Sequence, residues 1–595
     1  MAAPTTQKRH GRHYTPPELA GFLARRGAAR IPAGRKLRVL DPACGDGELL
    51  LSAASAAAQR GHEVIELAGL DVDPAAIGVA RGRLAGVPVP VSLSVRDFIR
   101  VPGEGPPLGQ FDLIITNPPY VRTQVLGAEV SRQLAARFGL HGRIDLTHAF
   151  VAAMRQLLTP GGVIALLCSN RFLSTRAGLN ARRLLGDGYL LHEVYDLGDT
   201  KLFGAAVLPA IVVGERRGDR PRADPPARFT RIYEAPGGDG PRGDGPRGEG
   251  PRGEGPGGEG PGGEGPGGGP PARQHASVLA ALDHGEDGRV AVGPRTFVIE
   301  TGELVTGDPH DPWRLGRESD AQWFADVMAG CWQTYGEIAR IRVGIKTTAD
   351  AVFIRENWDD LPDHGRPEPQ LLLPLITHGD TRAWRVSPAP AAKVLYPYDL
   401  TADRRRLLPL ASYPRAEAYL AGHEQRLRGR RYVADAGRAW YEIWVPQRPA
   451  LWGKPKLVFP DISEKPRFAI DSSGAVVNGD CYWISCEDLP SMDLAYLMLA
   501  VANSSLGVRF YDIACGNRLY SGKRRWITQY VAKLPLPDPA SVPARRAAEL
   551  ARRLSDPGAA AGCGRAAQAE LDDLIGRAFL GPAHRRSRPA RERTL

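Results

Sequence analysis

The sequence predicts an α/β fold, in which a doubly wound sheet is followed by a second, mixed α+β domain. Short apolar runs alternate with helical stretches in the N-terminal part, which is the pattern of strands joined by crossover helices. The first of these runs leads into a glycine-rich turn, Gly45-Asp-Gly47, that opens a helix. A low-complexity run then separates this part from a C-terminal part that is richer in tryptophan and tyrosine.

The individual elements follow from the same apolar runs. In the N-terminal part we expect a helix at Glu48–Arg60 and strands at Leu37–Leu40, Ile65–Leu70, Leu113–Thr116, Val163–Cys168 and Ala210–Val213. In the C-terminal part we expect a helix at Ala544–Leu554 and strand-like runs at Arg340–Ile345, Lys456–Phe459 and Cys481–Ser485. The chain closes with a basic stretch, Arg585–Arg593, that we expect to be frayed.

The low-complexity run sets the expected domain boundaries. Its five-residue units, such as Gly240-Pro-Arg-Gly-Asp, lack the glycine at every third position that a collagen helix requires. Proline and glycine dominate and no apolar side chains are available for a core, so we expect a disordered linker. The expected parts are a catalytic domain at 1–235, the linker at 236–272, a recognition domain at 273–540 and a helical, basic tail at 541–595.

Net charge and cysteine content give only weak indications of the partner and the compartment of the protein. Lysine and arginine number 77 against 66 acidic residues, a formal charge of +11. This excess fits a nucleic-acid partner, but it fits an ordinary solvated surface equally well. The seven cysteines show no zinc spacing, and the N-terminus has no apolar signal core. These features predict free thiols and a soluble, cytoplasmic protein.

The turn after the first strand predicts a cofactor site. Its sequence, Asp41-Pro-Ala-Cys-Gly-Asp-Gly47, combines glycines that allow a tight turn with the exposed N–H groups of a helix N-terminus. It lacks the G-x-G-x-x-G spacing of dinucleotide enzymes and starts with an acid. A carboxylate suits the amino group of a methionine moiety better than it suits a pyrophosphate. A plain tight turn remains the structural alternative.

Acidic residues also follow the second and third strands. Asp71 ends the second strand and could accept both hydroxyls of a ribose, with Val72 beside it. Asp73 is better suited to cap the helix that starts at the next residue. After the third strand, Asp97 could accept an adenine amino group while Phe98 covers the ring face.

The most specific motif follows the fourth strand and reads Asn117-Pro-Pro-Tyr120. An amine conjugated with a purine ring is a poor nucleophile. The side-chain oxygen of Asn117 and the carbonyl of Pro118 could accept its two N–H groups and favour a tetrahedral nitrogen. The prolines hold these acceptors still. Tyr120 could stack on the extruded base, since such a nitrogen cannot be approached inside a duplex.

The order of these motifs resembles the gamma-class N6-adenine DNA methyltransferases of type II restriction–modification systems. Gly11-Arg-His-Tyr-Thr15 matches the leading motif, whose threonine helps to hold methionine. The motifs at Asp41 and Asn117 match the two signature motifs of this family. Gly142–Phe150 matches the region that closes the cofactor pocket. Leu197–Phe203 matches the segment whose aromatic residue packs on the flipped adenine, although Ala206 stands where a basic residue is expected.

The resemblance extends past the linker with less specific blocks. The quoted segments are Val343–Ile354, Leu373–Asp380, Lys456–Ser463 and Asn503-Ser-Ser505. The resemblance implies a Rossmann-like methyltransferase sheet, a target-recognition domain, S-adenosylmethionine as cofactor, double-stranded DNA as partner and a monomer without a metal site. It implies catalytic roles for Asn117, Pro118, Tyr120 and Phe203, and cofactor-binding roles for Thr15, Asp41, Ala43, Gly45, Asp71, Val72, Asp97, Phe98 and Pro119.

Several rival functions stay open at this point. Protein glutamine methyltransferases use the same Asn-Pro-Pro-Tyr site but lack a large C-terminal domain, and RNA adenine methyltransferases are a second alternative. Cytosine N4 enzymes usually carry serine where Asn117 stands. A catalytically idle DNA-binding subunit would not need both intact motifs, and Pro460-Asp461 with Glu464-Lys465 lacks the spacing of a nuclease site. The DNA sequence recognised, the biological role and any separately encoded restriction or defence partner are not given by the sequence.

Overall fold

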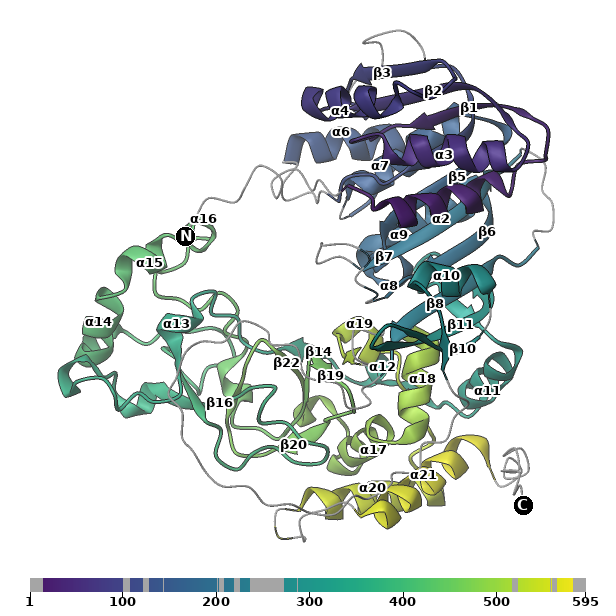
Figure 1. The fold of residues 1–595 in the computed structure, drawn as a ribbon. Coiled ribbons are helices and arrows are strands. Elements are labelled where there is room, and N and C mark those ends of the chain that lie inside the picture. The colour runs from purple at the N-terminus through teal and green to yellow at the C-terminus, as the bar shows by residue number, and fades with distance from the viewer. Residues whose placement is uncertain are drawn as a thin grey trace, which may run out of the picture. The chain divides into compact units, whose positions relative to one another are not determined.

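The computed structural model describes two compact units that meet in the sequence between Arg317 and Glu318 (Figure 1). The described residues are 14–99, 108–120, 128–142, 144–198, 200, 202, 208–218, 225–235, 272–285, 287–515, 523–556, 558 and 564–581. Within these ranges, none of the helices is long and apolar enough to cross a membrane. Each unit has its own hydrophobic cores, so each is described separately.

The first unit is built on one mixed sheet, in which twelve strands can be assigned among the described residues. The strands are β1 (Lys36–Asp41), β2 (Glu63–Asp71), β3 (Val91–Val95), β4 (Phe111–Thr116), β5 (Leu158–Ser169), β6 (Tyr189–Asp196), β7 (Pro209–Arg216), β8 (Arg228–Glu234), β9 (Arg273–Gln274), β10 (Gly288–Val292), β11 (Arg295–Val305) and β12 (Arg314–Gly316). Their order is β3-β2-β1-β4-β5-β7-β6-β8-β11-β10-β9, with β12 beside β11. The first five run parallel, and β7 is antiparallel to both of its neighbours.

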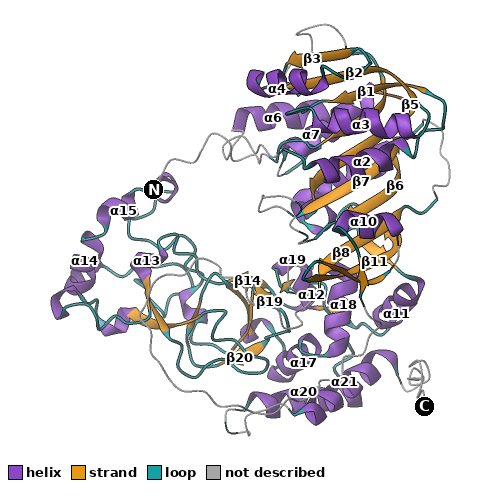
Figure 2. Cartoon of the chain, viewed as in Figure 1, coloured by secondary structure: helices purple, strands orange, loops and turns teal. Residues whose placement is uncertain are grey.

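Helices cover both faces of this sheet (Figure 2). They are α2 (Pro17–Ala28), α3 (Glu48–Gln59), α4 (Pro74–Leu84), α6 (Ala128–Phe138), α7 (Leu146–Leu157), α8 (Arg171–Ser174), α9 (Leu179–Gly188) and α10 (Val278–His284). Alternate side chains of a strand enter opposite cores: Leu113 and Ile115 pack with α2 and α3, whereas Ile114 packs with α7. This confirms the doubly wound α/β fold. The predicted strands and the predicted helix at 48–60 are also found, with small differences at their ends.

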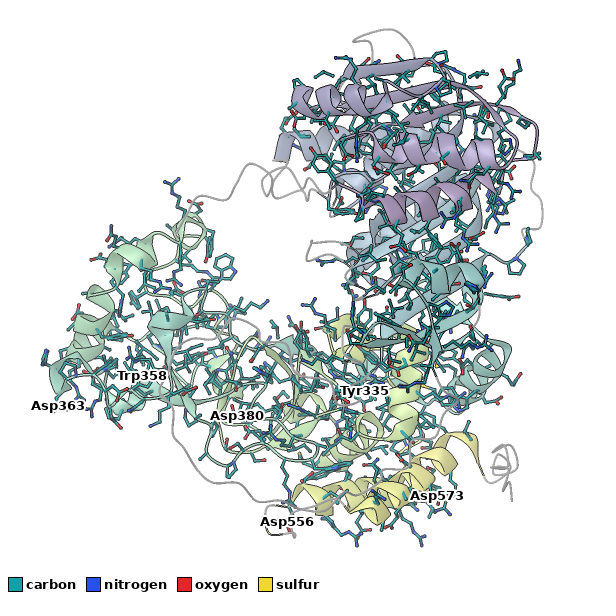
Figure 3. All side chains as sticks on the ribbon, viewed as in Figure 1. Tyr335, Trp358, Asp363, Asp380, Asp556 and Asp573 are labelled. Atoms are coloured by element: carbon teal, nitrogen blue, oxygen red, sulfur yellow. The ribbon has the colours of Figure 1, made fainter. Side chains whose placement is uncertain are left out.

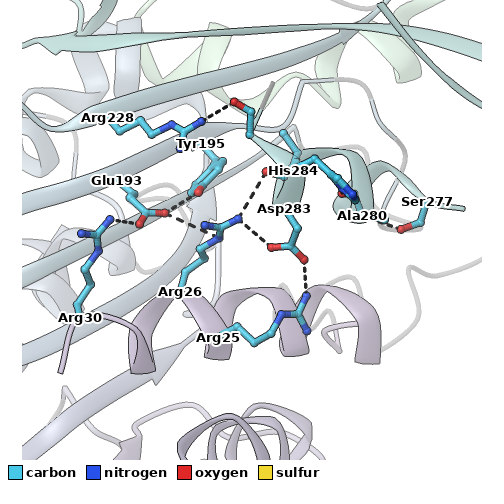
Figure 4. A network of polar contacts seen from close by, with 12 residues as sticks. Arg25, Arg26, Arg30, Glu193, Tyr195, Arg228, Ser277, Ala280, Asp283 and His284 are labelled. Atoms are coloured by element: carbon cyan, nitrogen blue, oxygen red, sulfur yellow. Dashed lines mark hydrogen bonds and ion pairs between the residues drawn. The ribbon is translucent and has the colours of Figure 1, made fainter. Parts of the chain in front are cut away.

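The expected domain boundary at residue 273 lies elsewhere. β8 pairs with β11 along seven residue pairs, so the low-complexity run lies between two strands of one sheet. Arg25 and Arg26 of α2 each form an ion pair of 2.8 Å with Asp283 of α10. Arg26 also approaches Glu193 of β6 at 3.9 Å, and Arg30 pairs with the same carboxylate (Figure 4). The pairing of β8 with β11 and the ion pairs of Asp283 attach residues 272–317 to the first unit.

The second unit contains short strands and many helices. Its strands are β13 (Gln333–Thr334), β14 (Ile341–Val343), β15 (Ile354–Arg355), β16 (Leu372–Ile376), β17 (Ala392–Leu395), β18 (Lys456–Pro460), β19 (Ile462–Ser463), β20 (Ala469–Asp471), β21 (Val476–Val477), β22 (Cys481–Ser485), β23 (Arg524–Arg525) and β24 (Pro535–Leu536). Its helices are α11 (Glu318–Ala329), α12 (Tyr335–Ile338), α13 (Asp350–Phe353), α14 (Pro414–Ala421), α15 (Glu424–Arg428), α16 (Arg431–Asp435), α17 (Met492–Ala502), α18 (Ser505–Cys515), α19 (Thr528–Val531), α20 (Val542–Ser555) and α21 (Arg565–Leu580).

The four-stranded sheet β14-β22-β18-β20 separates two cores of this unit. Leu457 and Phe459 of β18 face a core made with α17, α18, α20 and α21, and Val458 faces the other core. The helices expected to form a separate tail after residue 540 therefore belong to the second unit, because α20 and α21 bury their apolar sides against α17. The basic stretch at 585–593 lies outside the described residues.

Three of the sequence blocks quoted for the resemblance contribute hydrogen bonds or ion pairs to this unit. Asp380 accepts hydrogen bonds from the backbone N–H of Thr377 at 2.8 Å and from its hydroxyl at 2.7 Å, which closes a tight turn after β16 (Figure 3). Asn503 accepts a hydrogen bond from Phe468 N–H at 3.2 Å and donates one to its carbonyl at 2.9 Å. Lys456 and Asp471 form a buried ion pair of 2.7 Å.

Candidate active site

The predicted site residues follow strands whose carboxyl ends share one edge of the first sheet. Asp41 ends β1 and Asp71 ends β2, while Asn117 directly follows β4. The three strands are parallel neighbours in the order β2-β1-β4, so their ends point the same way. In open α/β sheets, ligands bind at this carboxyl edge. The fold therefore brings the cofactor and catalytic candidates together.

The turn after β1 needs its glycines. Gly45 has φ of +54° and Gly47 has φ of +83°, a region that other residues rarely adopt. A Cβ atom on Gly45 would lie 3.3 Å from the ring of Tyr14, and one on Gly47 would lie 3.2 Å from the side chain of Ala80. A side chain at either position would therefore be strained in its backbone conformation and crowded by its neighbour.

Asp41 is completely buried at the base of this turn. Its Oδ1 accepts a hydrogen bond from Ala43 N–H at 3.0 Å, whereas its Oδ2 has no hydrogen-bond partner among the described residues. Burial raises the pKa of Asp41 to about 7, and the charge of Asp71 adds to this rise. The Ala43 N–H and the Thr116 side chain oppose it. An unpartnered buried carboxylate oxygen fits the ammonium group of a bound methionine moiety.

Asp71 and Asp73 have different environments, as expected. Asp71 accepts hydrogen bonds from Gly45 N–H at 3.0 Å and Asp73 N–H at 2.9 Å, which fixes its carboxylate beside the turn. Asp73 accepts one from Ala75 N–H at 3.0 Å and is the N-cap of α4, so its predicted capping role is confirmed. Val72 between them is 56% exposed. The role of Asp71 in ribose binding stays a prediction.

The third strand places Asp97 and Phe98 next to this edge. Asp97 is exposed and accepts a hydrogen bond from Ile99 N–H at 2.9 Å. The partly buried Phe98 ring lies 5.0 Å from the ring of Phe150 on α7. α7 belongs to the segment matched to the pocket-closing region. Phe98 therefore has one apolar neighbour in place, and its contact with an adenine stays a prediction.

The Asn-Pro-Pro-Tyr motif is fixed by two side-chain hydrogen bonds. Asn117 donates from Nδ2 to Thr15 Oγ1 at 3.2 Å and accepts at Oδ1 from the Tyr120 hydroxyl at 2.7 Å. Pro118 is buried, and Pro119 is partly buried. Thr15, expected to hold methionine, is thus placed against the amide of Asn117. Asn117 is therefore held by one residue of its own motif and by one residue that lies 102 positions away in the sequence.

Tyr120 remains a hydrogen-bond donor over the whole physiological range. Burial raises the pKa of its hydroxyl well above the usual value, and nearby Cys168 and Asp145 add to the shift. Asp145 is the N-cap of α7 in a capping box with His148. Burial lowers the pKa of His148 to about 4, so this imidazole is neutral at pH 7.

A buried acid at the same edge was not predicted. Asp196 ends β6 and accepts hydrogen bonds from Asn170 Nδ2 at 2.9 Å, from Gly198 N–H at 3.2 Å and from the Tyr233 hydroxyl. Burial raises its pKa, and the donors from Tyr233 and Asn170 oppose the rise. Applying the strand-end rule to β5 and β6 would have found Asn170 and Asp196. Phe203, the aromatic candidate nearby in sequence, lies outside the described residues.

Metal chemistry has no set of ligands in the described part of the chain. No group of three or more histidine, cysteine, aspartate or glutamate side chains is placed there to hold an ion.

Comparisons with known proteins identify the family of the chain. Residues 97–203 match the model of the Eco57I restriction-modification methylase family. The chain is 36% identical over 557 residues to the type II methyltransferase M.BanIII of Aneurinibacillus aneurinilyticus, covering 90% of each protein. The release factor glutamine methyltransferase of Mycobacterium tuberculosis is 34% identical over 153 residues, only 25% of this chain and 48% of that protein.

A solved structure shares the fold over nearly the whole length. The type IIL restriction-modification enzyme MmeI, in its complex with DNA, matches 95% of this chain and 72% of that chain with a TM-score of 0.56 at 12% identity. Together with the full-length likeness to M.BanIII, the motifs at the sheet edge decide the family. The chain belongs to the type II methyltransferases of restriction–modification systems, and it is a site-specific DNA methyltransferase that uses S-adenosylmethionine.

Proposed function

We propose that the enzyme transfers the methyl group to N6 of an adenine that is flipped out of duplex DNA. The observation that carries this proposal is the fixed amide of Asn117, which is held between Thr15 and Tyr120 at the carboxyl edge of the sheet. The acidic turn residues Asp41 and Asp71 lie at the same edge. A rigid acceptor for an amine N–H thus stands next to the site that suits the cofactor.

The chemistry needs acceptors more than it needs a base. The N6 lone pair is delocalised into the purine ring, so nitrogen must be drawn toward tetrahedral geometry before it can attack. S-adenosylmethionine supplies the electrophilic methyl group. An amide oxygen has two lone pairs, so Asn117 Oδ1 can accept an N6 hydrogen in addition to the hydroxyl of Tyr120. The Pro118 carbonyl is the second proposed acceptor. Because both are held still before substrate arrives, little reorganisation is needed in the transition state.

The cofactor is proposed to bind across the ends of β1, β2 and β3. Asp41 would accept the methionine ammonium with its unpartnered oxygen. Asp71 would accept the ribose hydroxyls, while Phe98 and Asp97 would contact the adenine moiety. Ala43, Gly45, Val72 and Pro119 would line the pocket with backbone and apolar surface.

Adenine is favoured over the rival targets by two features. The likeness to the glutamine methyltransferase covers only a quarter of this chain. If the chain methylated glutamine in a protein, the second unit would have no assigned role. Cytosine N4 enzymes usually carry serine at the position of Asn117. We further propose that the first unit carries the catalytic chemistry and that the second unit reads duplex DNA.

Product analysis tests the adenine assignment. Plasmid DNA is incubated with the enzyme and S-adenosylmethionine, digested to nucleosides and analysed by mass spectrometry. We expect N6-methyldeoxyadenosine, and sequencing of the same DNA would give the recognition sequence. N4-methylcytosine as the product would overturn the assignment. A glutamine peptide and an RNA duplex serve as competing substrates in parallel reactions, and the Asn117→Ala variant serves as the inactive control.

A further inference from the structure

One segment of the second unit combines positive charge with aromatic side chains. Residues 424–448 contain six arginines against three acids, together with four tryptophan or tyrosine residues. They form α15, α16 and the chain that follows (Figure 1). The guanidinium groups of Arg426 and Arg431 are exposed and form no hydrogen bond or ion pair with the described residues. Tyr432 beside them is 43% exposed.

A buried arginine holds this segment in place from below. The Arg430 guanidinium donates hydrogen bonds to the carbonyls of Leu427 at 3.2 Å, Thr347 at 2.8 Å and Trp440 at 2.6 Å. It also lies over the ring of Phe353 at 5.7 Å from the centroid. The junction between α15 and α16 is therefore tied to the segment around residue 347. The exposed neighbours Arg426 and Arg431 project from a rigid support.

A second connection joins the same two segments. Lys346 and Val445 exchange backbone hydrogen bonds of 3.0 Å in both directions, and Gln447 donates from Nε2 to the Val343 carbonyl at 2.6 Å. Thr348 has φ of +58° and Gln447 has φ of +66°. Such conformations cost non-glycine residues on the order of 1–2 kcal/mol and gather at functional sites. Only three described non-glycine residues have positive φ, and two of them lie here.

The aromatic side chains of this face are also fixed. The rings of Tyr432 and Trp444 lie 5.0 Å apart in a T-shaped contact, and the Arg438 guanidinium lies 4.6 Å from the Trp444 centroid. Arg438 also donates a hydrogen bond to the Trp444 carbonyl. The exposed ring of Tyr432 thus keeps one position next to the exposed arginines. Lys346 is also exposed, and its backbone pairing with Val445 fixes it beside the segment that carries Trp444.

We propose that this arginine–aromatic face, formed by Lys346, Arg426, Arg431, Tyr432, Arg438 and Trp444, binds the sugar–phosphate backbone of the DNA substrate. This proposal rests on the proposed role of the second unit as the reader of duplex DNA. Arg426 and Arg431 suit phosphate oxygens because no ion pair with the described residues has to be broken before their guanidinium groups can bind, and because the backbone that carries them is already fixed. Backbone contacts of this kind set the position of the protein on the duplex and carry no sequence information.

A salt titration of DNA binding tests the face in the full-length protein. The Arg426→Ala/Arg431→Ala double variant is compared with wild type on a random-sequence 30-base-pair duplex, with S-adenosylhomocysteine present. Each lost phosphate contact should lower the slope of log affinity against log salt by about 0.9, hence by about 1.8 for the pair. The matched control is Arg552→Ala/Arg553→Ala, which removes two exposed charges from α20 of the same unit. Its slope should stay parallel to that of wild type.

The outcomes separate this face from the catalytic proposal. A slope unchanged in the Arg426/Arg431 variant, or lowered equally in both variants, would overturn the DNA-binding face; an acidic protein partner would then be its better occupant. Tyr432→Ala should weaken binding while leaving the slope parallel, because its ring carries no charge. At low salt and saturating DNA the variants should still form the wild-type methylated nucleoside. If wild type and variants alike form a nucleoside other than N6-methyldeoxyadenosine, the adenine proposal is refuted and the result on the salt slope still stands.

Discussion

The hydroxyl of Tyr120 donates a 2.7 Å hydrogen bond to Oδ1 of Asn117, the same atom that is proposed to accept an N6 hydrogen. Thr15 accepts from the other end of the amide at 3.2 Å, so the amide cannot rotate without losing both contacts. Donation from Nδ2 increases the negative charge on Oδ1, which strengthens it as an acceptor. The sequence motif predicted a stacking role for Tyr120, and the structure adds a role in orienting Asn117.

The Tyr120→Phe substitution separates these two roles. It keeps the ring for stacking but removes the hydroxyl that orients Asn117. Loss of one neutral hydrogen bond is worth about 0.5–1.5 kcal/mol, so kcat should fall roughly 2- to 12-fold while KM for DNA changes little. Single-turnover methylation of a duplex measures this. A variant with wild-type kcat would show that stacking alone accounts for Tyr120, and Tyr120→Ala provides the comparison in which both roles are lost.

The Asn117→Ala substitution tests the acceptor itself. Removing one preorganised contact to the reacting group costs about 3–4 kcal/mol, which corresponds to a rate loss on the order of 100- to 1000-fold. Affinity for S-adenosylmethionine, measured by calorimetry, should change little because the turn at Asp41 is untouched. Near-normal methyl transfer by this variant would contradict the proposed role of Asn117.

The strand-end motifs could be predicted because they depend on local sequence. An apolar run followed by an acid and glycines specifies both the strand and the turn, and parallel strands then bring Asp41, Asp71 and Asn117 to one edge. The bond between Thr15 and Asn117 could not be predicted from the residues alone, since 102 positions separate them. The orientation of Tyr120 likewise depends on its burial, which becomes known only when the fold is complete.

The predicted domain boundary at residue 273 was wrong because it, too, depends on non-local contacts. A proline- and glycine-rich run usually joins domains, but here it connects strands of one sheet. The pairing of β8 with β11 links residues such as Glu234 and Arg295, whose side chains meet at 2.9 Å across 61 positions. No strand was predicted at 228–234 or at 295–305, and the sheet that such a strand joins is decided by its non-local partner.

The raised pKa of Asp41 predicts a pH dependence of cofactor binding. Its folded pKa of about 7 lies above the ordinary value of 3.8. Ionised Asp41 attracts an ammonium group, so affinity for S-adenosylmethionine should fall up to about tenfold per pH unit below pH 7 and level off above it for as long as the ammonium group of the cofactor keeps its proton. Calorimetry between pH 5.5 and 8.5 measures this. The Asp41→Asn variant should bind weakly with a flat profile over this range, and a slope that persists there would exclude Asp41 as its source.

The same shift predicts an effect on the stability of the free enzyme. A raised folded pKa favours the folded state below pH 3.8, and this advantage is lost progressively as pH rises to about 7. The rise of roughly 3 pKa units corresponds to about 4 kcal/mol at most. Above pH 7, Asp41→Asn should therefore unfold at a higher temperature than wild type without cofactor, as scanning calorimetry would show. A lower unfolding temperature at pH 8 would contradict the burial penalty assigned to Asp41.

Asp71 and Asp73 should respond differently to removal. Asp71→Ala should weaken S-adenosylmethionine binding by roughly 1.5–3 kcal/mol, because a charge-assisted contact and the support of Gly45 are both lost. Asp73→Ala removes the cap of α4 and should lower the unfolding free energy by about 1 kcal/mol with cofactor affinity nearly unchanged. Calorimetric titration and chemical denaturation of both variants decide the matter. If Asp73→Ala weakened cofactor binding and Asp71→Ala did not, Asp73 would be the cofactor-binding carboxylate.

The position of the unit boundary decides which truncated chains can fold. A chain that ends at Arg217 keeps every catalytic motif but loses β8 and β11, which exposes the edge of β6. It also loses the buried side chains of Ile232 and Phe297 from the core that contains Tyr195. We therefore expect the chain 1–217 to aggregate. The chain 1–317 keeps the whole sheet and should be a folded monomer in size-exclusion chromatography.

The chain 1–317 should bind S-adenosylmethionine about as well as the full-length enzyme, because every proposed cofactor contact lies before residue 120. It should methylate duplex DNA poorly and without sequence preference, since the proposed reader is absent. The Asp71→Ala version of 1–317 is the matched control for cofactor binding. If 1–217 folds and binds cofactor as well as 1–317, then β8 to β12 are not needed for folding of the first unit. The division of the chain at Arg317 would then not be the minimal boundary of a stable domain. If 1–317 methylates one defined sequence, recognition does not reside in the second unit.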